Sequence, residues 1–361
     1  MRLTHIVGNR PQFIKLAPFL EATKNYKLEN VIIHSGQHYD IEMSEVFFDE
    51  LEIPEPNYNL EVGSGTHGIQ TGKMLMALDP ILLKLKPDVV VVYGDTNTTL
   101  AGALAAYKLH IPVAHVEAGM REYIWRPEEM NKKISDHCAD FCFCPIKRAY
   151  ENLVREGIAS DKIFFTGDIT YDAYIRNKDI ALDKANIEIP DFEYILMTMH
   201  RAETVDIYER ISNIVDAIIQ IPTKIVFPVH PRTKKRLMEF KLYERLEKAN
   251  NIILMNPIGY LEFLKLLMKA KLVITDSSGV IKETFYAQKM GVTIDDTTEY
   301  QEIFDMEYNV LAGFKGDSII KKISFMMEKE FIPPSENPFG DGHSAERMVE
   351  ILYKKLGGFC K

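Results

Sequence analysis

The chain has 361 residues, a length that suits two domains better than one ordinary hydrophobic core. Hydrophobic residues make up 46% and charged residues 26%, the balance of a soluble globular protein rather than a disordered or fibrous one. The formal net charge of -9 argues against a nucleic-acid binder, because neutralising phosphates requires a net basic face.

No segment approaches the roughly 18 uninterrupted apolar residues of a membrane span. Met1 leads into the strand-like residues 3–7 without a signal-peptide pattern, so we expect no leader. Of the four cysteines, Cys142 and Cys144 alternate with phenylalanines, which puts both thiols on one face of a short strand. Because no second cysteine pair exists to complete a metal site, we expect buried thiols, no metal and a reducing, cytoplasmic compartment.

Short β-branched runs alternate with helical patterns, such as 13–25 and 98–109, through the first half of the chain. The run 88–94 reads DVVVVYG and is apolar on both faces, as expected of a strand in a helix-covered parallel sheet. The strands predicted in this half are residues 3–8, 30–36, 88–94, 111–117, 141–145 and 163–167.

The second half repeats the plan, with predicted strands at residues 194–200, 224–230, 252–257, 272–276, 291–294 and 309–311. Two successive βα arrays predict an α/β fold of two Rossmann-like, doubly wound domains with a cleft between them. We expect an N-terminal domain at 1–170 and a C-terminal domain at 171–343, with the boundary in the polar stretch 171–189. The final helix, 344–356, is expected to cross back, so that residues 344–361 join the first domain.

Ligands of open parallel sheets bind beyond the carboxyl ends of the strands, so the residues that follow each strand are informative. Arg10 and Lys15 follow the first strand and would flank a helix N-terminus, where an anion is favoured; the alternative is two surface cations. Asp95 follows DVVVVYG, where an aspartate is as readily a helix N-cap as a functional group.

Further charged residues follow the next strand of the first half. Glu117 comes directly after IPVAHV, with Arg121 four residues on and the pair Glu128 and Glu129 at an expected helix start. Carboxylates at a helix start also serve capping and dipole roles. Together with Asp95, the carboxylates of Glu117 and of the Glu128 pair nevertheless exceed what capping requires in one domain.

In the second half, two predicted strands end in histidine: His200 is followed by Arg201, and His230 by Pro231 and Arg232. Lone histidines are more often structural than catalytic. Two at neighbouring strand ends, each with an arginine close by, favour a cluster that faces an anion.

The segment LVITDSSGVIKE places Ser277, Ser278 and Gly279 at a strand-to-helix turn, with Glu283 about one turn into the helix. Small residues let a backbone approach a pyrophosphate, and a carboxylate behind them can accept from ribose hydroxyls. The chain contains no P-loop motif, which excludes a P-loop NTPase. No GxGxxG follows a strand, which disfavours a tightly held NAD.

Taken together, these segments resemble the non-hydrolysing UDP-N-acetylglucosamine 2-epimerase family over nearly the whole chain. Single motifs are weak, but their number and order are specific. The motifs are GNRPQFIK at 8–15, SGQHYD at 35–40, GSGTHGIQTGKML at 63–75, YGDTNTTLAGALAA at 93–106, HVEAGMR at 115–121, RPEEMNK at 126–132, MHRAE at 199–203, FPVHPR at 227–232, TDSSGVIKE at 275–283 and NPFGDGHSAER at 337–347.

The resemblance implies the two-domain fold of many nucleotide-sugar glycosyltransferases (GT-B), a UDP-binding C-terminal domain and a homodimer. It also implies inversion of carbon-2 by elimination and re-addition of UDP, without a redox cofactor. The residues that fall on the family's active-site positions are Arg10, Lys15, Asp95, Glu117, Glu128 and His200, and those on its uridine-diphosphate site are Ser277, Ser278 and Glu283. We also expect Arg121, His230 and Gly279 to bind the substrate or its UDP group.

Several residues depart from the family's usual motifs. Asn9 and Gln12 stand in a segment that usually reads GTRPE, and Tyr300 stands in one that usually reads TERPE. These features look more like a sister branch that epimerises UDP-2,3-diacetamido-2,3-dideoxyglucuronate. Residues 37–40 read QHYD where members activated by their own substrate usually have QHRE, which argues against substrate activation.

Three other functions remain open from the sequence: a retaining UDP-sugar glycosyltransferase on the same fold, a hydrolysing epimerase and a catalytically dead UDP-sugar sensor. A glycosyltransferase would need an acceptor groove but not three carboxylates after first-domain strands. The RPQFIK start fits the non-hydrolysing group better than the hydrolysing one, and the complete set of proton carriers disfavours the sensor.

Overall fold

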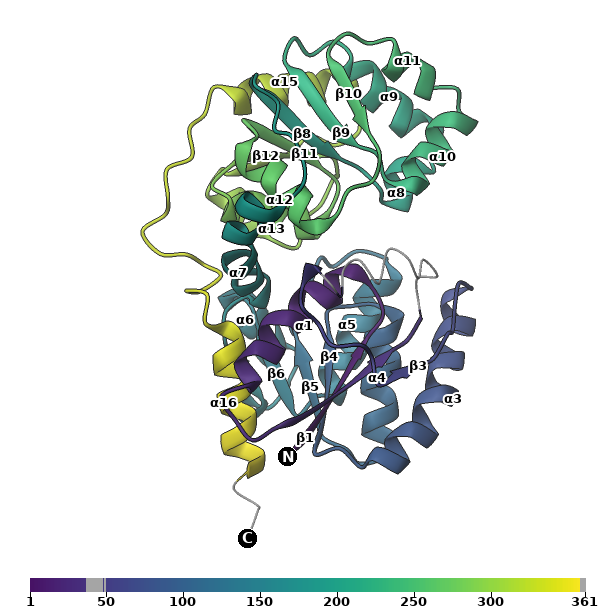
Figure 1. Ribbon diagram of the computed structural model, residues 1–361, viewed down its shortest axis with the longest axis vertical. Helices are drawn as coiled ribbons and strands as arrows, with labels where there is room; N and C mark the ends of the chain where they lie inside the picture. The colour runs from purple at the N-terminus through teal and green to yellow at the C-terminus, as the bar shows by residue number, and fades with distance from the viewer. Residues whose placement is uncertain (37–47, 49, 358–361) are drawn as a thin grey trace. The chain divides into compact units, whose positions relative to one another are not determined.

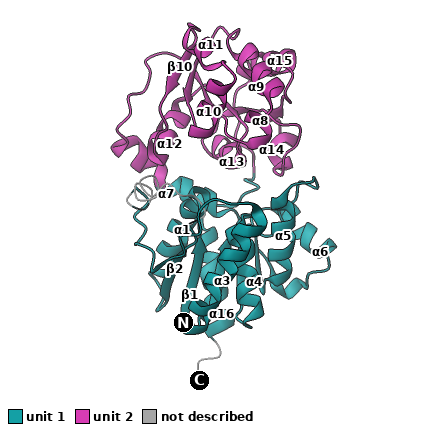
Figure 2. Ribbon diagram, turned by 90° about the vertical axis from the view of Figure 1, so that its right-hand side faces the viewer, with its two compact units in different colours: residues 1–176, 336–361 teal, residues 177–335 magenta. Residues whose placement is uncertain are grey.

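The computed structural model describes residues 1–36, 48 and 50–357. The chain forms two compact units (Figure 2), one comprising Met1–Arg176 and Glu336–Lys361 and the other Asn177–Ser335. The change from the first unit to the second falls inside a continuous helix, α7 (Ile169–Lys184), where the sequence suggested only a polar stretch.

Unit 1 is built on a parallel sheet, which has seven strands among the described residues, in the order β3-β2-β1-β4-β5-β6-β7 (Figure 1). The β-branched runs form its centre, and all five residues of β4 are buried. The strands are β1 (Arg2–Val7), β2 (Glu29–His34), β3 (Tyr58–Asn59), β4 (Val89–Tyr93), β5 (Val113–Val116), β6 (Phe141–Cys144) and β7 (Ile163–Phe165).

Helices cover both faces of this sheet, as the doubly wound pattern requires. The last helix belongs to unit 1 and packs against the first, with the rings of Tyr26 and Tyr353 4.9 Å apart. The unit 1 helices other than α7 are α1 (Arg10–Thr23), α3 (His67–Leu85), α4 (Asn97–Lys108), α5 (Pro127–Cys138), α6 (Lys147–Arg155) and α16 (Ser344–Gly357), with a 3₁₀ turn at Ser160–Lys162.

Unit 2 repeats the architecture with six parallel strands in the described chain, in the order β10-β9-β8-β11-β12-β13. The strands are β8 (Tyr194–Thr198), β9 (Lys224–Pro228), β10 (Ile252–Met255), β11 (Leu272–Thr275), β12 (Met290–Thr293) and β13 (Asn309–Leu311). The helices are α8 (Ala202–Val205), α9 (Tyr208–Ile218), α10 (Pro231–Glu239), α11 (Tyr243–Glu247), α12 (Tyr260–Lys269), α13 (Ser278–Tyr286), α14 (Gln301–Asp305) and α15 (Gly316–Met327).

The predicted α/β fold class is confirmed, and each predicted strand lies at its expected place to within a few residues. The two-residue strand β3 was missed, because Tyr58 and Asn59 have no β-branched run around them. Cys142 and Cys144 are buried in β6 as expected, and burial raises the pKa of both thiols.

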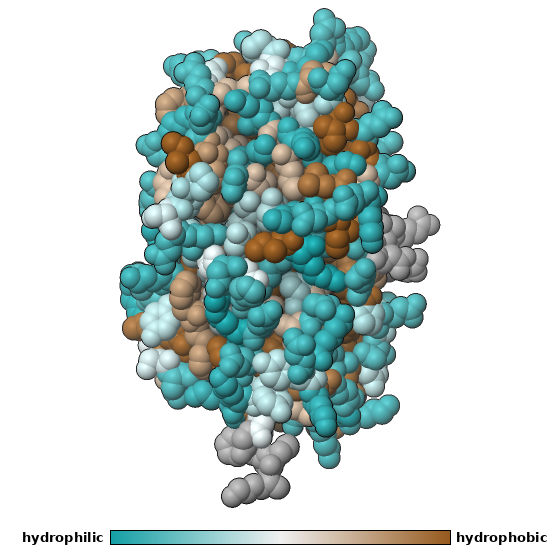
Figure 3. Space-filling model, turned by 60° about the vertical axis from the view of Figure 1, so that its left-hand side comes forward, coloured by the Kyte–Doolittle hydropathy of each residue, from teal (hydrophilic) through white to brown (hydrophobic). Residues whose placement is uncertain are grey.

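The face drawn in Figure 3 is largely hydrophilic, with hydrophobic residues in small groups. Within the described residues, no helix combines the length and the apolar character that crossing a membrane would require.

Candidate active site

In unit 1 the strand order reverses between β1 and β4, which is where ligands of doubly wound sheets bind. The side chain of Gln12 joins the two strand ends. It accepts from the Gly8 amide at 2.7 Å and donates to the Tyr93 carbonyl at 2.8 Å and to the hydroxyls of Thr96 and Thr99 at 3.1 Å. Only 1% of Gln12 is exposed, so this residue supports the site from beneath rather than facing a ligand.

Next to this support, the Lys15 ammonium in α1 forms an ion pair with the Glu117 carboxylate. Only 11% and 9% of the two side chains are exposed. Glu117 has a φ of 67°, a left-handed conformation that costs a non-glycine residue about 1–2 kcal/mol. The turn after β5 therefore holds the carboxylate in a strained position at the end of the strand.

Gly94 lies beside this ion pair. A Cβ atom there would lie 3.4 Å from Lys15 Nζ and 3.5 Å from Glu117 Oε2, which are ordinary contact distances. Its φ is +65°, so the left-handed backbone rather than a lack of space favours glycine here.

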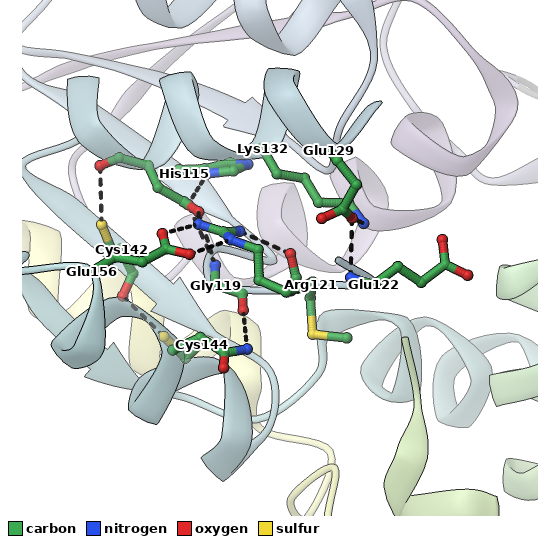
Figure 4. Close-up of polar contacts among 12 residues, drawn as sticks. His115, Gly119, Arg121, Glu122, Glu129, Lys132, Cys142, Cys144 and Glu156 are labelled. Atoms are coloured by element: carbon green, nitrogen blue, oxygen red, sulfur yellow. Dashed lines mark hydrogen bonds and ion pairs between the residues drawn. The ribbon is translucent and has the colours of Figure 1, made fainter. Parts of the chain in front are cut away.

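A buried network fixes the turn from the side of α5 (Figure 4). The Asp136 carboxylate, which is fully buried, lies 2.7 Å from His115 Nδ1 and accepts from the Gly119 amide at 3.2 Å and from Arg121 at 2.6 Å. Arg121 also donates two hydrogen bonds to Glu156, at 2.9 and 2.6 Å. Although burial opposes it, the charges and hydrogen bonds of His115 and Arg121 hold the pKa of Asp136 below its usual value.

The sequence suggested that Arg121 contacts a ligand phosphate. In the structure its guanidinium is occupied by Asp136, Glu156 and the carbonyl of Met120, and the residue is 5% exposed. Its described contacts are therefore those of a support for the turn that carries Glu117, not of a residue directed at a ligand.

The same network reaches β4. His115 Nε2 lies 2.7 Å from the carbonyl oxygen of Gly94, the residue that precedes Asp95. Because β4 and β5 are paired with Tyr93 opposite Val116, Asp95 and Glu117 follow neighbouring strand ends. Adjacent strands lie about 4.8 Å apart, so these two acidic residues leave the sheet side by side.

Asp95 has a basic neighbour that sequence reasoning did not single out. Lys132 Nζ in α5 lies 3.9 Å from an Asp95 carboxylate oxygen and 2.9 Å from Glu129. Glu129 is buried and also accepts from the amides of Glu122 and Tyr123, so it holds Lys132 and the preceding loop in place. The RPEEMNK motif contained both residues, but their roles emerge only when α5 packs beside β4.

Glu128 and Arg10 occupy helix starts. Glu128 lies in the first turn of α5, half-buried, and within the described part of the chain its carboxylate has no hydrogen bond or ion pair. Arg10 is the first residue of α1, after Asn9, whose side chain accepts from the Gln12 amide.

In unit 2 the strand order reverses between β8 and β11, and His200 and Asp276 follow these two strands. Asp276 is fully buried and accepts from the backbone amides of His200 at 3.0 Å and Arg201 at 2.8 Å. The His200 ring stays 39% exposed, with Nδ1 3.7 Å from Asp276. The carboxylate thus fixes the backbone of the turn and leaves the imidazole at the edge of the sheet.

His230 lies beside His200, with ring centroids 5.4 Å apart. It is the N-cap of α10, and its Nδ1 accepts from the Arg232 amide at 3.2 Å. The remaining ring nitrogen, Nε2, is then the one that carries the hydrogen in the neutral imidazole. The structure therefore brings the two predicted histidines together.

The expected uridine-diphosphate residues lie around the start of α13. Ser277 is its N-cap, Ser278 its first residue and Gly279 its second, while Glu283 is buried further along. Arg201, expected beside His200 in a cluster that faces an anion, donates to the Ser278 hydroxyl and to Asp295 at 2.7 Å. The start of α13 thus carries an arginine, two hydroxyls and backbone amides, a set of donors suited to a diphosphate.

Comparisons with known proteins show the family to which the chain belongs. The family model described as UDP-N-acetylglucosamine 2-epimerase matches residues 20–353. A UDP-N-acetylglucosamine 2-epimerase of Methanocaldococcus jannaschii is 46% identical over 98% of this chain and 99% of its own length. A UDP-2,3-diacetamido-2,3-dideoxy-D-glucuronate 2-epimerase of Pseudomonas aeruginosa is 41% identical over 98% of this chain and 100% of its own.

The fold comparison agrees. The M. jannaschii UDP-GlcNAc 2-epimerase, solved in complex with UDP-GlcNAc and UDP, superimposes with a TM-score of 0.93 at 45% identity, covering 98% of this chain and 100% of that one. The predicted GT-B-like fold is thereby confirmed.

Proposed function

The chain belongs to the UDP-N-acetylglucosamine 2-epimerase family and is therefore an isomerase, and we propose that it converts UDP-N-acetylglucosamine to UDP-N-acetylmannosamine. The observation that carries this proposal is the pair of acidic residues, Asp95 and Glu117, at neighbouring strand ends of unit 1, with Glu117 held beside Lys15 in a strained turn.

The reaction consists of two balanced steps. A carboxylate removes the proton from carbon-2, the electron pair forms a carbon–carbon double bond, and the carbon-1 to oxygen bond breaks as UDP leaves. UDP then adds back to the bound 2-acetamidoglucal, while a second group delivers a proton to the other face of carbon-2. The path needs two proton carriers and cations that stabilise the departing diphosphate.

Unit 1 supplies the proton carriers. We assign them to Asp95, Glu117 and Glu128, with Arg10 contributing positive charge for the phosphates. Lys15, predicted as a phosphate ligand, is instead assigned to Glu117, because its ammonium forms a buried ion pair with that carboxylate and holds it in place.

Unit 2 supplies the diphosphate contacts. We assign them to His200, His230 and the start of α13 with Ser277, Ser278 and Gly279. Arg201 is added to this set because of its hydrogen bond to Ser278. Glu283 is assigned to the ribose hydroxyls.

The proposed reaction is tested by following the incorporation of deuterium from solvent into the product. The protein is incubated with UDP-N-acetylglucosamine alone in deuterium oxide, and products are followed by NMR. We expect UDP-N-acetylmannosamine carrying deuterium at carbon-2, because the removed proton exchanges with solvent. Epimerisation with full retention of the original hydrogen would overturn the elimination path. Release of free sugar would indicate a hydrolase. No turnover without an acceptor would indicate a transferase, a sensor or an epimerase of the second candidate substrate described next.

A second candidate substrate is UDP-2,3-diacetamido-2,3-dideoxyglucuronate, favoured by the 41% identity to the P. aeruginosa enzyme that bears this name. Comparing kcat/KM for the two sugar nucleotides decides between them. A preference of more than about tenfold, or about 1.4 kcal/mol, in either direction settles the assignment.

We also propose a homodimer. The proposal is supported by Ile69, Met76 and Leu83, which recur every seven residues on α3 and are 57%, 79% and 54% exposed. A helix face of this kind suits packing against a second copy of the chain. Light scattering of the purified protein tests it: the mass of one chain, 41.4 kDa, would contradict the dimer.

A further inference from the structure

A group of lysines that the proposed chemistry does not use lies at the amino-terminal ends of strands in the unit 2 sheet. These ends are opposite to the carboxyl ends that His200 and Asp276 follow. Lys269 ends α12, Lys271 directly precedes β11, and Lys289 directly precedes β12. Because β11 and β12 pair with Leu272 opposite Met290, Lys271 and Lys289 enter the sheet side by side. Adjacent strands lie about 4.8 Å apart, so one ligand can reach both ammonium groups.

These three lysines line an open surface pocket of about 560 Å³, within the usual range for small-molecule sites. Among the described residues, none of their ammonium groups has a hydrogen bond or an ion pair. The pocket's other charged residues are Glu193, Glu330 and Lys329, and Lys329 is paired with Glu307. The lining therefore carries more positive than negative charge, in a protein whose formal net charge is -9.

Lys289 lies deepest in this group and is half-buried, whereas Lys269 and Lys271 are exposed. Burial, together with the charges of Lys269 and Lys271, lowers the pKa of Lys289. Its ammonium is thus held where neither solvent nor a carboxylate compensates it fully. Such an arrangement costs stability unless a ligand of opposite charge completes it.

A simpler explanation is that the lysines neutralise the C-terminal ends of α12 and α13, where cations are favourable. That role applies to single lysines near helix ends. It does not require three lysines to line one pocket, as Lys269, Lys271 and Lys289 do.

We propose that Lys269, Lys271 and Lys289 form a binding site for a small multivalent anion of the phosphate class, separate from the residues assigned to UDP. The inference stands on the pocket and the lysine cluster and does not depend on which sugar nucleotide the enzyme uses.

The test uses inorganic pyrophosphate as the probe. Thermal unfolding and titration calorimetry are run on the full chain, with and without saturating UDP, so that anion held at the UDP-binding residues is counted separately. The variant is Lys289→Met, which keeps an unbranched side chain, shorter by one atom, and removes its charge. The control is Lys184→Met, which removes one exposed lysine charge elsewhere in unit 2.

With UDP present, we expect the wild type and Lys184→Met to bind pyrophosphate equally, and Lys289→Met to bind it about tenfold more weakly, as expected for the loss of one charge-assisted contact. Without any anion, Lys289→Met should unfold at the same or a higher temperature than the wild type, because a repelled charge has been removed. Equal pyrophosphate affinity in all three proteins would overturn the site. A lower unfolding temperature for Lys289→Met without anion would support helix capping and also overturn it.

Discussion

The charged residues at the carboxyl ends of the strands differ between the two sheets in their burial and in their partners. In unit 1 the acidic group of Glu117 is 9% exposed, paired with Lys15 and held in a left-handed turn. In unit 2 the buried carboxylate, Asp276, binds backbone amides, and the His200 ring above it is 39% exposed. A group that takes a proton from carbon needs a fixed position and a controlled charge, whereas a group that holds a leaving diphosphate must be reachable and can adjust.

The largest expected effect tests the unit 1 half of this comparison. Glu117→Gln removes a proton carrier while keeping its size, so kcat should fall by about 10²–10⁴. Asp95→Asn and Glu128→Gln should each lose at least about a hundredfold on the same grounds. Steady-state kinetics with UDP-N-acetylglucosamine measures the loss, and circular dichroism with UDP titration verifies folding and binding. Near-normal turnover in one variant would mean that its residue has only a capping role. Near-normal turnover in two variants would leave the catalytic assignment without support.

The second prediction contrasts the two buried aspartates. Asp136→Asn leaves Arg121 and His115 facing a neutral group, so the free energy of unfolding should fall by about 3–5 kcal/mol. Asp276→Asn should cost less, because Asp276 accepts chiefly from backbone amides and an asparagine oxygen can still accept from them. Urea unfolding of the two variants measures both. Equal losses would contradict the distinction between Asp136, which pairs with charged side chains, and Asp276, which binds backbone amides.

The pH dependence of the Asp136 variant has a defined sign. The folded pKa of Asp136 lies below its ordinary 3.8, so its contribution to stability is present above that pH and is lost as the pH falls through the folded value. The difference in unfolding free energy between wild type and Asp136→Asn should therefore be constant near neutral pH and shrink in acid. A difference that grows as the pH falls would contradict the assigned charge state.

The third prediction concerns unit 2. His200→Ala removes a donor whose contact with the diphosphate strengthens as UDP leaves, a charge-assisted bond of about 1.5–3 kcal/mol. We expect kcat to fall by about tenfold to a hundredfold, with ground-state binding of the substrate less affected. His343→Ala, which removes an exposed histidine of unit 1 paired with Glu346, serves as the control and should change neither constant. A raised KM at unchanged kcat would make His200 a uniform binder.

The contrast between the units also explains what could be predicted from the sequence. Strands and the polar residues after them were predictable, because apolar β-branched runs and their ends are local features. The partner of a buried charge is not local: Asp136 stands in the last turn of α5 and meets His115, 21 residues earlier, only after packing. For the same reason Arg121 suggested a phosphate ligand in a motif, although its donors go to Asp136 and to Glu156, 35 residues away.

Residues 37–40, used to argue against substrate activation, lie outside the described residues.

The smallest expected effect concerns two residues that suggested the diacetamido-glucuronate branch, one in each unit. Tyr300 of unit 2 is buried, with the Lys282 ammonium 5.2 Å from its ring centroid. Gln12 of unit 1 is 1% exposed and joins the ends of β1 and β4. Neither environment is that of a side chain that selects between sugars, so their identity reflects packing at these positions.

Gln12→Glu restores the residue of the common motif and tests this directly. The variant loses the amide hydrogens donated to Tyr93, Thr96 and Thr99, so we expect the free energy of unfolding to fall by about 1–3 kcal/mol. Activity toward UDP-N-acetylglucosamine and toward the diacetamido-glucuronate should fall in parallel, because both depend on the strand ends that Gln12 joins. The ratio of the two kcat/KM values should therefore stay within about tenfold of the wild-type ratio, or about 1.4 kcal/mol. A larger change in that ratio would mean that the geometry beneath Lys15 and Glu117 selects the sugar, and Gln12 would then belong among the specificity determinants.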